Sequence, residues 1–274
     1  MSNRKNGNGG NNNNGNGGDD DEQKVKQLLE DAHGTGALSA RSLAALDVVD
    51  VGAQIQAGLG CTVDDVAASE VVLVTMMPDD SQSIAAANNT AAVRDGHNFV
   101  LEALRSSKQS GEVLAHTRYL NGTVLCPYTA LEHAVTMTRS NYDPQLGTPL
   151  YDQAVVLLGT VIAKSQELAQ AGIAVRTVTL IITDGADYGS TRCKPADVKA
   201  LVADLLAQEN HIVAAMGISD GSTDFAAVFR SMGIPDRWIL TPGNSASEIR
   251  RAFAVFSQSA VRASQGVQLG GFSN

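Results

Sequence analysis

Residues 71–77 read Val-Val-Leu-Val-Thr-Met-Met, an apolar stretch of strand length, and Pro78-Asp79-Asp80-Ser81-Gln82-Ser83 follows it directly. A continuous apolar run of this length is typical of a strand that is buried on both faces of a sheet. A second such run covers residues 175–183, Val-Arg-Thr-Val-Thr-Leu-Ile-Ile-Thr, and Asp184 comes immediately after it. The two runs therefore predict a parallel sheet with both faces covered.

Helical patterns alternate with the predicted strands along the chain. Thr148-Pro149 predicts the start of a long helix to about Ala171, with Thr148 as N-cap, Pro149 at the first helical position and Gly172 past the end. Further helices are predicted at 91–104, at 195–208, at 223–232 and after the capping box Ser245-Ala246-Ser247-Glu248. Further strands are predicted at 211–218 and 238–241.

One pair of strands is predicted to be antiparallel. The β-rich runs 113–120 and 123–128 flank Asn121-Gly122, a dipeptide that favours a tight hairpin turn. Together with the alternating helices, this predicts an α/β fold. We expect a Rossmann-like, doubly wound, mostly parallel sheet with one antiparallel hairpin edge and helices on both faces.

The ends of the chain have a different composition. Residues 1–22 are mostly Asn, Gly and Asp, which predicts disorder because they offer no apolar surface to offset the entropy of ordering. A helix is predicted over 23–33, and one or two helical pieces over 37–60 from Ser39, with a strand at 48–51 as an alternative. The predicted organisation is a disordered tail at 1–22, a helical extension at 23–67, the α/β domain at 68–262 and a C-terminal tail at 263–274.

Oxygen-bearing side chains follow the predicted strands. In open parallel sheets, ligands bind beyond the carboxyl ends of the strands, near the point where the strand order reverses. Asp79, Ser81 and Ser83 come directly after the first buried strand. Thr148 precedes the long helix and Asp184 follows the second buried strand. Three loops are therefore expected to bring these five side chains to one edge of the sheet.

This pattern resembles the von Willebrand factor type A (VWA) domain, whose metal-ion-dependent adhesion site (MIDAS) combines D-x-S-x-S, a Thr and an Asp on three such loops. The resemblance covers residues 68–262. Two sequence motifs are typical of bacterial members: Gly-Thr-Pro-Leu-Tyr-Asp at 147–152 and Thr-Asp-Gly at 183–185. It implies a bacterial intracellular protein-binding domain, with MoxR-type AAA ATPases or multi-protein assembly and stress systems as the partner class. The implied metal ligands are Asp79, Ser81, Ser83, Thr148 and Asp184.

The donor set agrees with the chemistry of Mg²⁺, which takes six oxygens in near-octahedral geometry. Three of the five donors are neutral hydroxyl groups, so much of the charge of the ion stays uncompensated and attracts an external carboxylate. We therefore expect a Mg²⁺ site, with Mn²⁺ or Ca²⁺ as alternatives, that binds a Glu or Asp side chain of a partner protein. Since no general base is evident beside the site, we expect no enzymatic activity.

Some residues near the motif depart from the family pattern. Pro78 replaces an aliphatic residue and Gln82 replaces a glycine. Asp80 adds a negative charge beside the site, which favours cation binding and disfavours an acidic ligand. Asp152 and Asp187 are candidate extra ligands, but we interpret them as solvated residues of a helix surface and a loop.

The motif is also compatible with other roles. Ser81 and Ser83 are positioned to cap the following helix, a role compatible with metal binding. An alternative function is phosphoryl transfer by a HAD-like phosphatase with Asp79 as nucleophile. Such enzymes usually carry a second carboxylate two residues later, where this chain has Ser81, and no lysine is obviously placed to hold a phosphate. A Rossmann nucleotide site lacks support because no G-x-G-x-x-G follows Met77.

Composition argues against several classes of protein. The 274 residues are 43% hydrophobic but 4% aromatic, so the core must be aliphatic. The formal net charge of −9 argues against a nucleic-acid-binding surface. Since no run of about 18 uncharged apolar residues occurs, we expect neither a membrane span nor a secretory signal. Three widely spaced cysteines without a C-x-x-C motif suit a reducing cytoplasm, where we expect the protein to be located.

Overall fold

The computed structural model describes residues 17–47, 50–267 and 270–272. Its six strands form one sheet in the order β3-β2-β1-β4-β5-β6. Strands β2 and β3 pair antiparallel, and all other neighbours in this sheet pair parallel. The strands are β1 (Glu70–Met77), β2 (Val113–Arg118), β3 (Val124–Ala130), β4 (Ala174–Thr183), β5 (His211–Gly217) and β6 (Ile239–Leu240).

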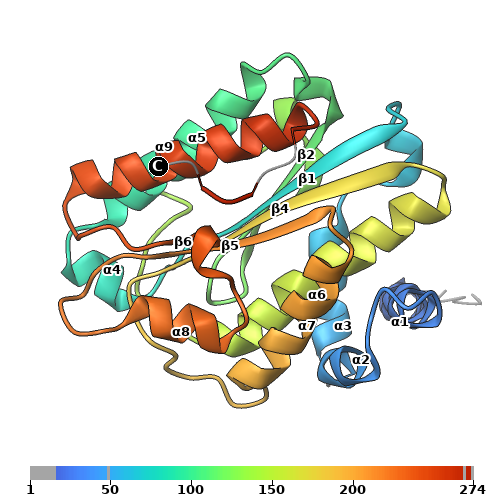
Figure 1. Ribbon diagram of the computed structural model, residues 1–274, viewed down its shortest axis with the longest axis horizontal. Coiled ribbons are helices and arrows are strands. Elements are labelled where there is room, and N and C mark those ends of the chain that lie inside the picture. The colour runs from blue at the N-terminus through green and yellow to red at the C-terminus, as the bar shows by residue number, and fades with distance from the viewer. Residues whose placement is uncertain (1–16, 48–49, 268–269, 273–274) are drawn as a thin grey trace, which may run out of the picture.

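Helices cover both faces of the sheet (Figure 1). Helices α5 (Thr90–Arg105) and α9 (Ala246–Ser264) pack together on one face. Helices α6 (Leu150–Gln170) and α7 (Pro195–Ala207) cover the other, and α8 (Phe225–Ser231) contacts α7 and β5. The predicted doubly wound α/β fold with one antiparallel hairpin edge is confirmed.

The strand order reverses between β1 and β4. From β1 the chain continues outward to β2 and β3, whereas from β4 it continues in the opposite direction to β5 and β6. The connection after β1 runs through α5 on one face and the connection after β4 runs through α7 on the other. Such a reversal leaves a crevice at the carboxyl ends of the two adjacent central strands. The loops that begin after Met77 and Thr183 start at this crevice.

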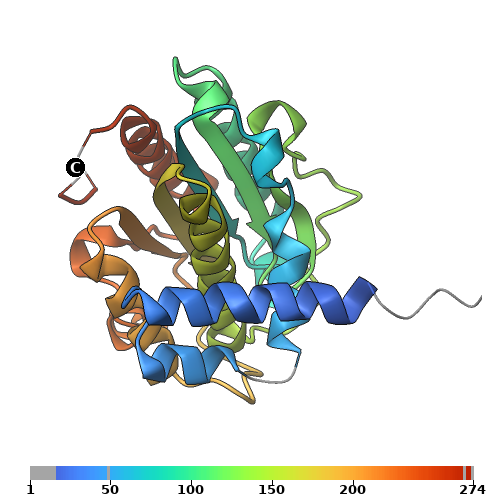
Figure 2. The ribbon, with the colours of Figure 1, turned by 90° about the vertical axis from the view of Figure 1, so that its right-hand side faces the viewer.

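Three N-terminal helices form a further layer outside α6 and α7. Helices α1 (Gly17–Gly34) and α3 (Val51–Leu59) pack against α6, and α2 (Ala40–Leu46) packs against α7, as Figure 2 shows for α1 in front of the sheet. Lys24 of α1 and the buried Lys164 of α6 both pair with Glu167, at 2.6 and 2.8 Å. The extension is therefore held to the α/β domain by charge pairing as well as by apolar contacts.

The prediction for the N-terminal tail was wrong in part. Helix α1 begins at Gly17, so residues 17–22 are helical rather than disordered. The exposed carboxylates of Asp20, Asp21 and Glu22 lie near the start of this helix, where negative charge interacts favourably with the helix dipole. The disorder predicted for residues 1–16 lies outside the described residues.

Within residues 37–60, the prediction of two helical pieces is confirmed by α2 and α3. The side chain of Ser39 caps α2 by accepting the N–H of Ser42. The alternative strand at 48–51 is wrong at Val51, where α3 begins, and residues 48–49 lie outside the described residues. Both helices contact α6.

The C-terminal tail is packed where the structure describes it. The N–H of Phe272 donates to the carbonyl oxygen of Arg237 at 2.9 Å. The ring of Phe272 meets Trp238 edge to face, with 5.2 Å between the ring centroids. The prediction of a separate tail from residue 263 was therefore wrong for Phe272, and also for Ala263 and Ser264, which belong to α9. In the described part of the chain, no helix combines the length and apolar composition needed to cross a membrane.

Candidate metal site

Asp79 connects two of the predicted site loops. It is fully buried and follows β1. One carboxylate oxygen accepts the N–H of Ser81 at 2.7 Å, and the other accepts the hydroxyl of Thr183 at 2.7 Å and the N–H of Asp184 at 3.3 Å. The hydroxyl of Tyr142 donates to the Asp79 carbonyl oxygen at 2.5 Å. Asp79 therefore fixes the loop after β1 against the end of β4.

A row of three oxygen atoms spans the same two loops. Ser81 Oγ and Ser83 Oγ are 2.8 Å apart, and Ser83 Oγ donates to Asp184 Oδ1 at 2.5 Å. Ser81 is the N-cap residue of α4 (Gln82–Ala86), but its hydroxyl belongs to this row. Around an octahedral Mg²⁺ with bonds of about 2.1 Å, neighbouring oxygens are about 3 Å apart. The separations of 2.8 and 2.5 Å are those of hydrogen bonds and are shorter than this, so the oxygens would have to move apart to ligate one ion. The chemistry of the donors, two hydroxyls and a carboxylate gathered at one place, fits a divalent cation.

Thr148 lies on a third loop that is hydrogen-bonded to both of the others. The N–H of Gln82 donates to the carbonyl oxygen of Leu146 at 3.0 Å. Thr148 and Tyr188 exchange two backbone hydrogen bonds, at 3.0 and 2.8 Å. Thr148 is buried, and its Oγ1 lies 3.9 Å from where a Cβ on Gly185 would be. The structure therefore places Thr148 beside the loop that carries Asp184.

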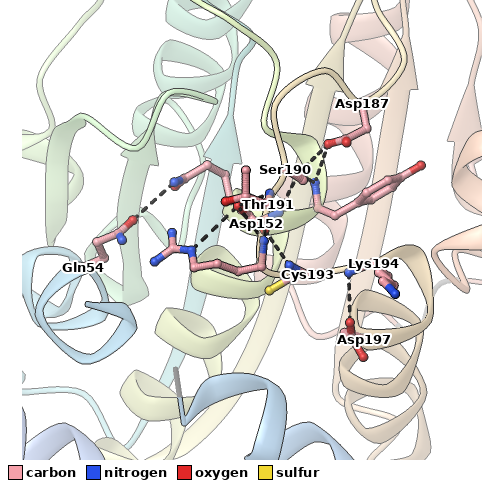
Figure 3. Close-up of polar contacts among 11 residues, drawn as sticks. Gln54, Asp152, Asp187, Ser190, Thr191, Cys193, Lys194 and Asp197 are labelled. Atoms are coloured by element: carbon pink, nitrogen blue, oxygen red, sulfur yellow. Dashed lines mark hydrogen bonds and ion pairs between the residues drawn. The ribbon is translucent and has the colours of Figure 1, made fainter. Parts of the chain in front are cut away.

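The prediction that Thr148 caps the long helix was wrong. The N-cap position of α6 belongs to Pro149. The first N–H groups of α6 donate to Ser190 Oγ at 3.0 and 3.1 Å and to Asp187 Oδ1 at 3.3 Å, as Figure 3 shows. Because Ser190 and Asp187 satisfy the start of the helix, the hydroxyl of Thr148 is available for another role.

Asp152 anchors the loop after β4, so its interpretation as a solvated residue was wrong. It is buried, and its carboxylate accepts the N–H groups of Thr191 at 2.9 Å, Arg192 at 3.1 Å and Cys193 at 2.7 Å (Figure 3). Burial raises the pKa of Asp152, but these N–H donors outweigh burial and leave the pKa below its usual value. Asp152 is thus a positioning residue, and so is Asp187, whose carboxylate also accepts the Ser190 hydroxyl.

Asp80 and Gln82, which lie within the motif, make contacts that hold the loops of the site. The buried carboxylate of Asp80 accepts the N–H of Asn121 at 3.0 Å and so holds the hairpin turn. Burial raises the pKa of Asp80 to about 7, against the effect of the Asn121 hydrogen bond, and the charge of Asp79 adds to the rise. The charge expected from Asp80 is therefore reduced near neutral pH. Gln82 has an exposed side chain, and its N–H joins two site loops through Leu146.

The ionised state of both Asp79 and Asp184 is energetically unfavourable in the absence of a cation. Burial raises the pKa of Asp79. Burial also raises the pKa of Asp184 to about 6; the Ser83 hydroxyl opposes this, and the charges of Asp79 and Asp220 increase it. In the described part of the chain, no group of three or more His, Cys, Asp or Glu side chains is placed to hold a metal. Hydroxyl oxygens must therefore complete any cation site built on Asp79 and Asp184.

Stabilisation by Mg²⁺ should increase between about pH 5.5 and pH 7.5. Because the pKa of Asp184 is raised to about 6 in the folded protein, protonation stabilises the metal-free fold at low pH, and this stability is lost as the pH rises through that value. A cation needs the ionised carboxylate, so its binding strengthens over the same range. Melting temperatures with Mg²⁺ and with NaCl of equal ionic strength measure the effect. A Mg²⁺-dependent shift that is equal at both pH values would contradict the assignment of Asp184.

No protein-family model matches the chain, and curated protein sequences give no match either. The pilus adhesin SpaC from Lactobacillus rhamnosus GG is similar in structure, with a TM-score of 0.50, 13% identity and coverage of 70% of this chain and 31% of that chain.

Two other solved structures are less similar. Proximal thread matrix protein 1 from the mussel byssus, with a zinc-occupied MIDAS motif, has a TM-score of 0.42, 13% identity and coverage of 70% of this chain and 46% of that chain. The SpRpn10 VWA domain has a TM-score of 0.38, 9% identity and coverage of 66% and 92%. The chain spans less than half of the first structures that it matches. The likeness to SpaC shows the fold alone.

Proposed function

We propose that this chain is a metal-dependent protein-binding module with a MIDAS. Its fold resembles that of VWA domains, and the three loops that carry the candidate ligands meet where the strand order reverses. The observation that carries this proposal is the row of Ser81, Ser83 and Asp184 oxygens, at separations of 2.8 and 2.5 Å. The proposed ligands are Asp79, Ser81, Ser83, Thr148 and Asp184. We propose Mg²⁺ as the ion, with Mn²⁺ and Ca²⁺ as alternatives, because hydroxyl and carboxylate oxygens suit hard cations.

The ligand residues differ in role. The hydroxyl groups of Ser81, Ser83 and Thr148 and the carboxylate of Asp184 are the proposed direct oxygen donors. Asp79 already accepts hydrogen bonds on both oxygens, so it serves to position the loops and to accept hydrogen bonds from metal-bound water. When bound, the ion supplies an electrophilic position for an external carboxylate.

Binding is a better fit than catalysis for this site. A nucleophilic Asp79 would have to reach substrate, but its carboxylate is fully buried beneath the loops that it holds together. We therefore propose that Asp79 is not a nucleophile and that the chain is not an enzyme. A phosphatase assay with Asp79→Asn as control tests this, because activity that disappears in the variant would support the alternative.

The partner is proposed to be a protein that offers a Glu or Asp side chain. MoxR-type AAA ATPases, the class that the sequence resemblance implies, are the first candidates for a binding assay. We further propose a bacterial cytoplasmic location. The free thiols of Cys61, Cys126 and Cys193 support it, because a reducing compartment keeps thiols unpaired.

Thr148→Ala should abolish partner capture from a cell lysate in Mg²⁺ buffer. The variant removes one neutral donor without changing net charge, so a loss points to site geometry rather than to long-range electrostatics. The measurement is a pull-down read by mass spectrometry, with and without EDTA. Thr136→Ala changes an exposed threonine that is not a proposed ligand, and this variant should capture the same partners as the wild type. Capture that survives both EDTA and Thr148→Ala would contradict the proposal.

A further inference from the structure

Two exposed apolar side chains lie on the loops of the candidate site. Large hydrophobic side chains that are exposed in the described residues are Phe99, Val135, Leu146, Tyr188 and Val267. Of these, Leu146 is 51% exposed and Tyr188 is 81% exposed. Leu146 lies two residues before Thr148, and Tyr188 lies four residues after Asp184. Exposed apolar groups that gather around a binding site point to a surface that a partner covers.

The backbone holds both residues in place. The N–H of Leu146 donates to the carbonyl oxygen of Asp80 at 3.3 Å, and its carbonyl oxygen accepts the N–H of Gln82 at 3.0 Å. Tyr188 exchanges two backbone hydrogen bonds with Thr148. The two side chains are therefore presented to solvent from hydrogen-bonded segments, and the same bonds connect them to the loops of the proposed ligands.

The pairing pattern also places both residues next to Thr148 along the backbone. Thr148 and Tyr188 form an antiparallel bridge, so they lie directly opposite each other. Leu146 precedes Thr148 by two positions and forms a parallel bridge with Ser81. Leu146 and Tyr188 therefore lie on the two segments that connect Thr148 to the loops of Ser81 and Asp184.

The charges around the site restrict the partner further. Asp220 is exposed and close enough to Asp184 to interact with it electrostatically. Asp143 is exposed on the segment that leads to Leu146. One carboxylate of a partner would be held by the ion, but additional carboxylates would face these negative charges. The surroundings therefore disfavour further acidic residues beside the one that the ion holds.

We propose that Leu146 and Tyr188 are the specificity-determining residues of the binding face. The matching partner segment carries a single Asp or Glu flanked by apolar or aromatic side chains. This inference rests on the proposed function, because the acidic residue binds at the proposed metal site. It adds that the ion selects the carboxylate, whereas Leu146 and Tyr188 select its neighbours.

A phage-displayed library of short peptides with random sequence tests this. The library is selected in Mg²⁺ buffer on the full chain and on the double variant Leu146→Ser/Tyr188→Ser. Wild-type selection should enrich Asp or Glu with apolar neighbours, and a selected peptide should bind the double variant about tenfold more weakly. The double variant should still select an acidic residue and should keep its Mg²⁺-dependent melting shift. Phe99→Ser, which removes an equally exposed apolar side chain from α5, should select as the wild type does.

The outcomes separate this inference from the proposed function. If the wild type enriches acidic residues without apolar neighbours, or if the double variant keeps the same neighbours, the roles of Leu146 and Tyr188 are refuted and the metal site stands. If no acidic residue is enriched in a Mg²⁺-dependent way, the proposed function fails and this inference fails with it.

Discussion

At a Mg²⁺ concentration of about 100 times its Kd, the wild-type chain should be stabilised by about 2.7 kcal/mol, and Asp184→Ala should reduce this stabilisation to near zero. The substitution removes both an oxygen and the negative charge from the row that Ser83 joins at 2.5 Å. Because burial raises the pKa of Asp184, its charge is unfavourable without an ion. In EDTA the variant should therefore be at least as stable as the wild type. Thermal melts in EDTA and in Mg²⁺ measure both quantities.

Asp143→Ala is the matched control for this experiment. It makes the same charge change at an exposed carboxylate, on the segment that leads to the third site loop. The control should keep the full Mg²⁺-dependent shift, because Asp143 is not a proposed ligand. An equal loss in both variants would assign the effect to general electrostatics. A full shift in Asp184→Ala would show that the ligand assignment is wrong.

Gly60→Ala should lower the free energy of unfolding by about 4 kcal/mol. Gly60 has a φ of +64°, and a Cβ at this position would lie 2.1 Å from the carbonyl oxygen of Tyr128. The same oxygen accepts the N–H of Cys61 at 2.8 Å, which joins the N-terminal extension to β3. The clash therefore falls on backbone that cannot shift without weakening this connection. Urea denaturation of the full chain measures the loss.

Gly172→Ala separates backbone strain from the steric clash. Gly172 has a similar φ of +79°, but no atom lies within 4 Å of where its Cβ would be. This variant should lose only about 1 kcal/mol, the strain of a left-handed residue. If both variants lose a similar free energy of unfolding, the backbone at Tyr128 shifts at little cost. The close approach at Gly60 would then not contribute to stability.

The sheet and the loops of the candidate site could be predicted because their signals are local. A strand buried on both faces is a continuous apolar run, so the predicted strand at 71–77 differs from β1 by one residue. Asp79 and Asp184 follow such strands directly, and topology alone brings them to one edge. That the five residues bind a metal stays a prediction, although the structure places their loops together.

The errors occurred where the deciding partner is distant in sequence. Thr148 precedes a proline and a helix, which favours a capping role, but Ser190 satisfies the first N–H groups of that helix from 39 and 38 residues away. Asp152 has the polar character of a surface residue, yet the backbone N–H groups that it accepts come from residues 191–193. The packing of Phe272 on Trp238 likewise follows from tertiary contact. Local propensity does not encode such pairings.

Helix α6 is covered by the sheet on one side and by the N-terminal helices on the other, which affects how this domain can be produced in isolation. Gly159 of α6 lies against Leu46 and Ile55, so closely that a Cβ there would be 2.6 and 2.7 Å from their side chains. A recombinant chain shortened to residues 68–262 would lack the N-terminal helices and would expose to water the face of α6 that packs against them. Large exposed apolar patches promote self-association. Truncation at the boundary suggested by the family resemblance is therefore expected to give an aggregating protein.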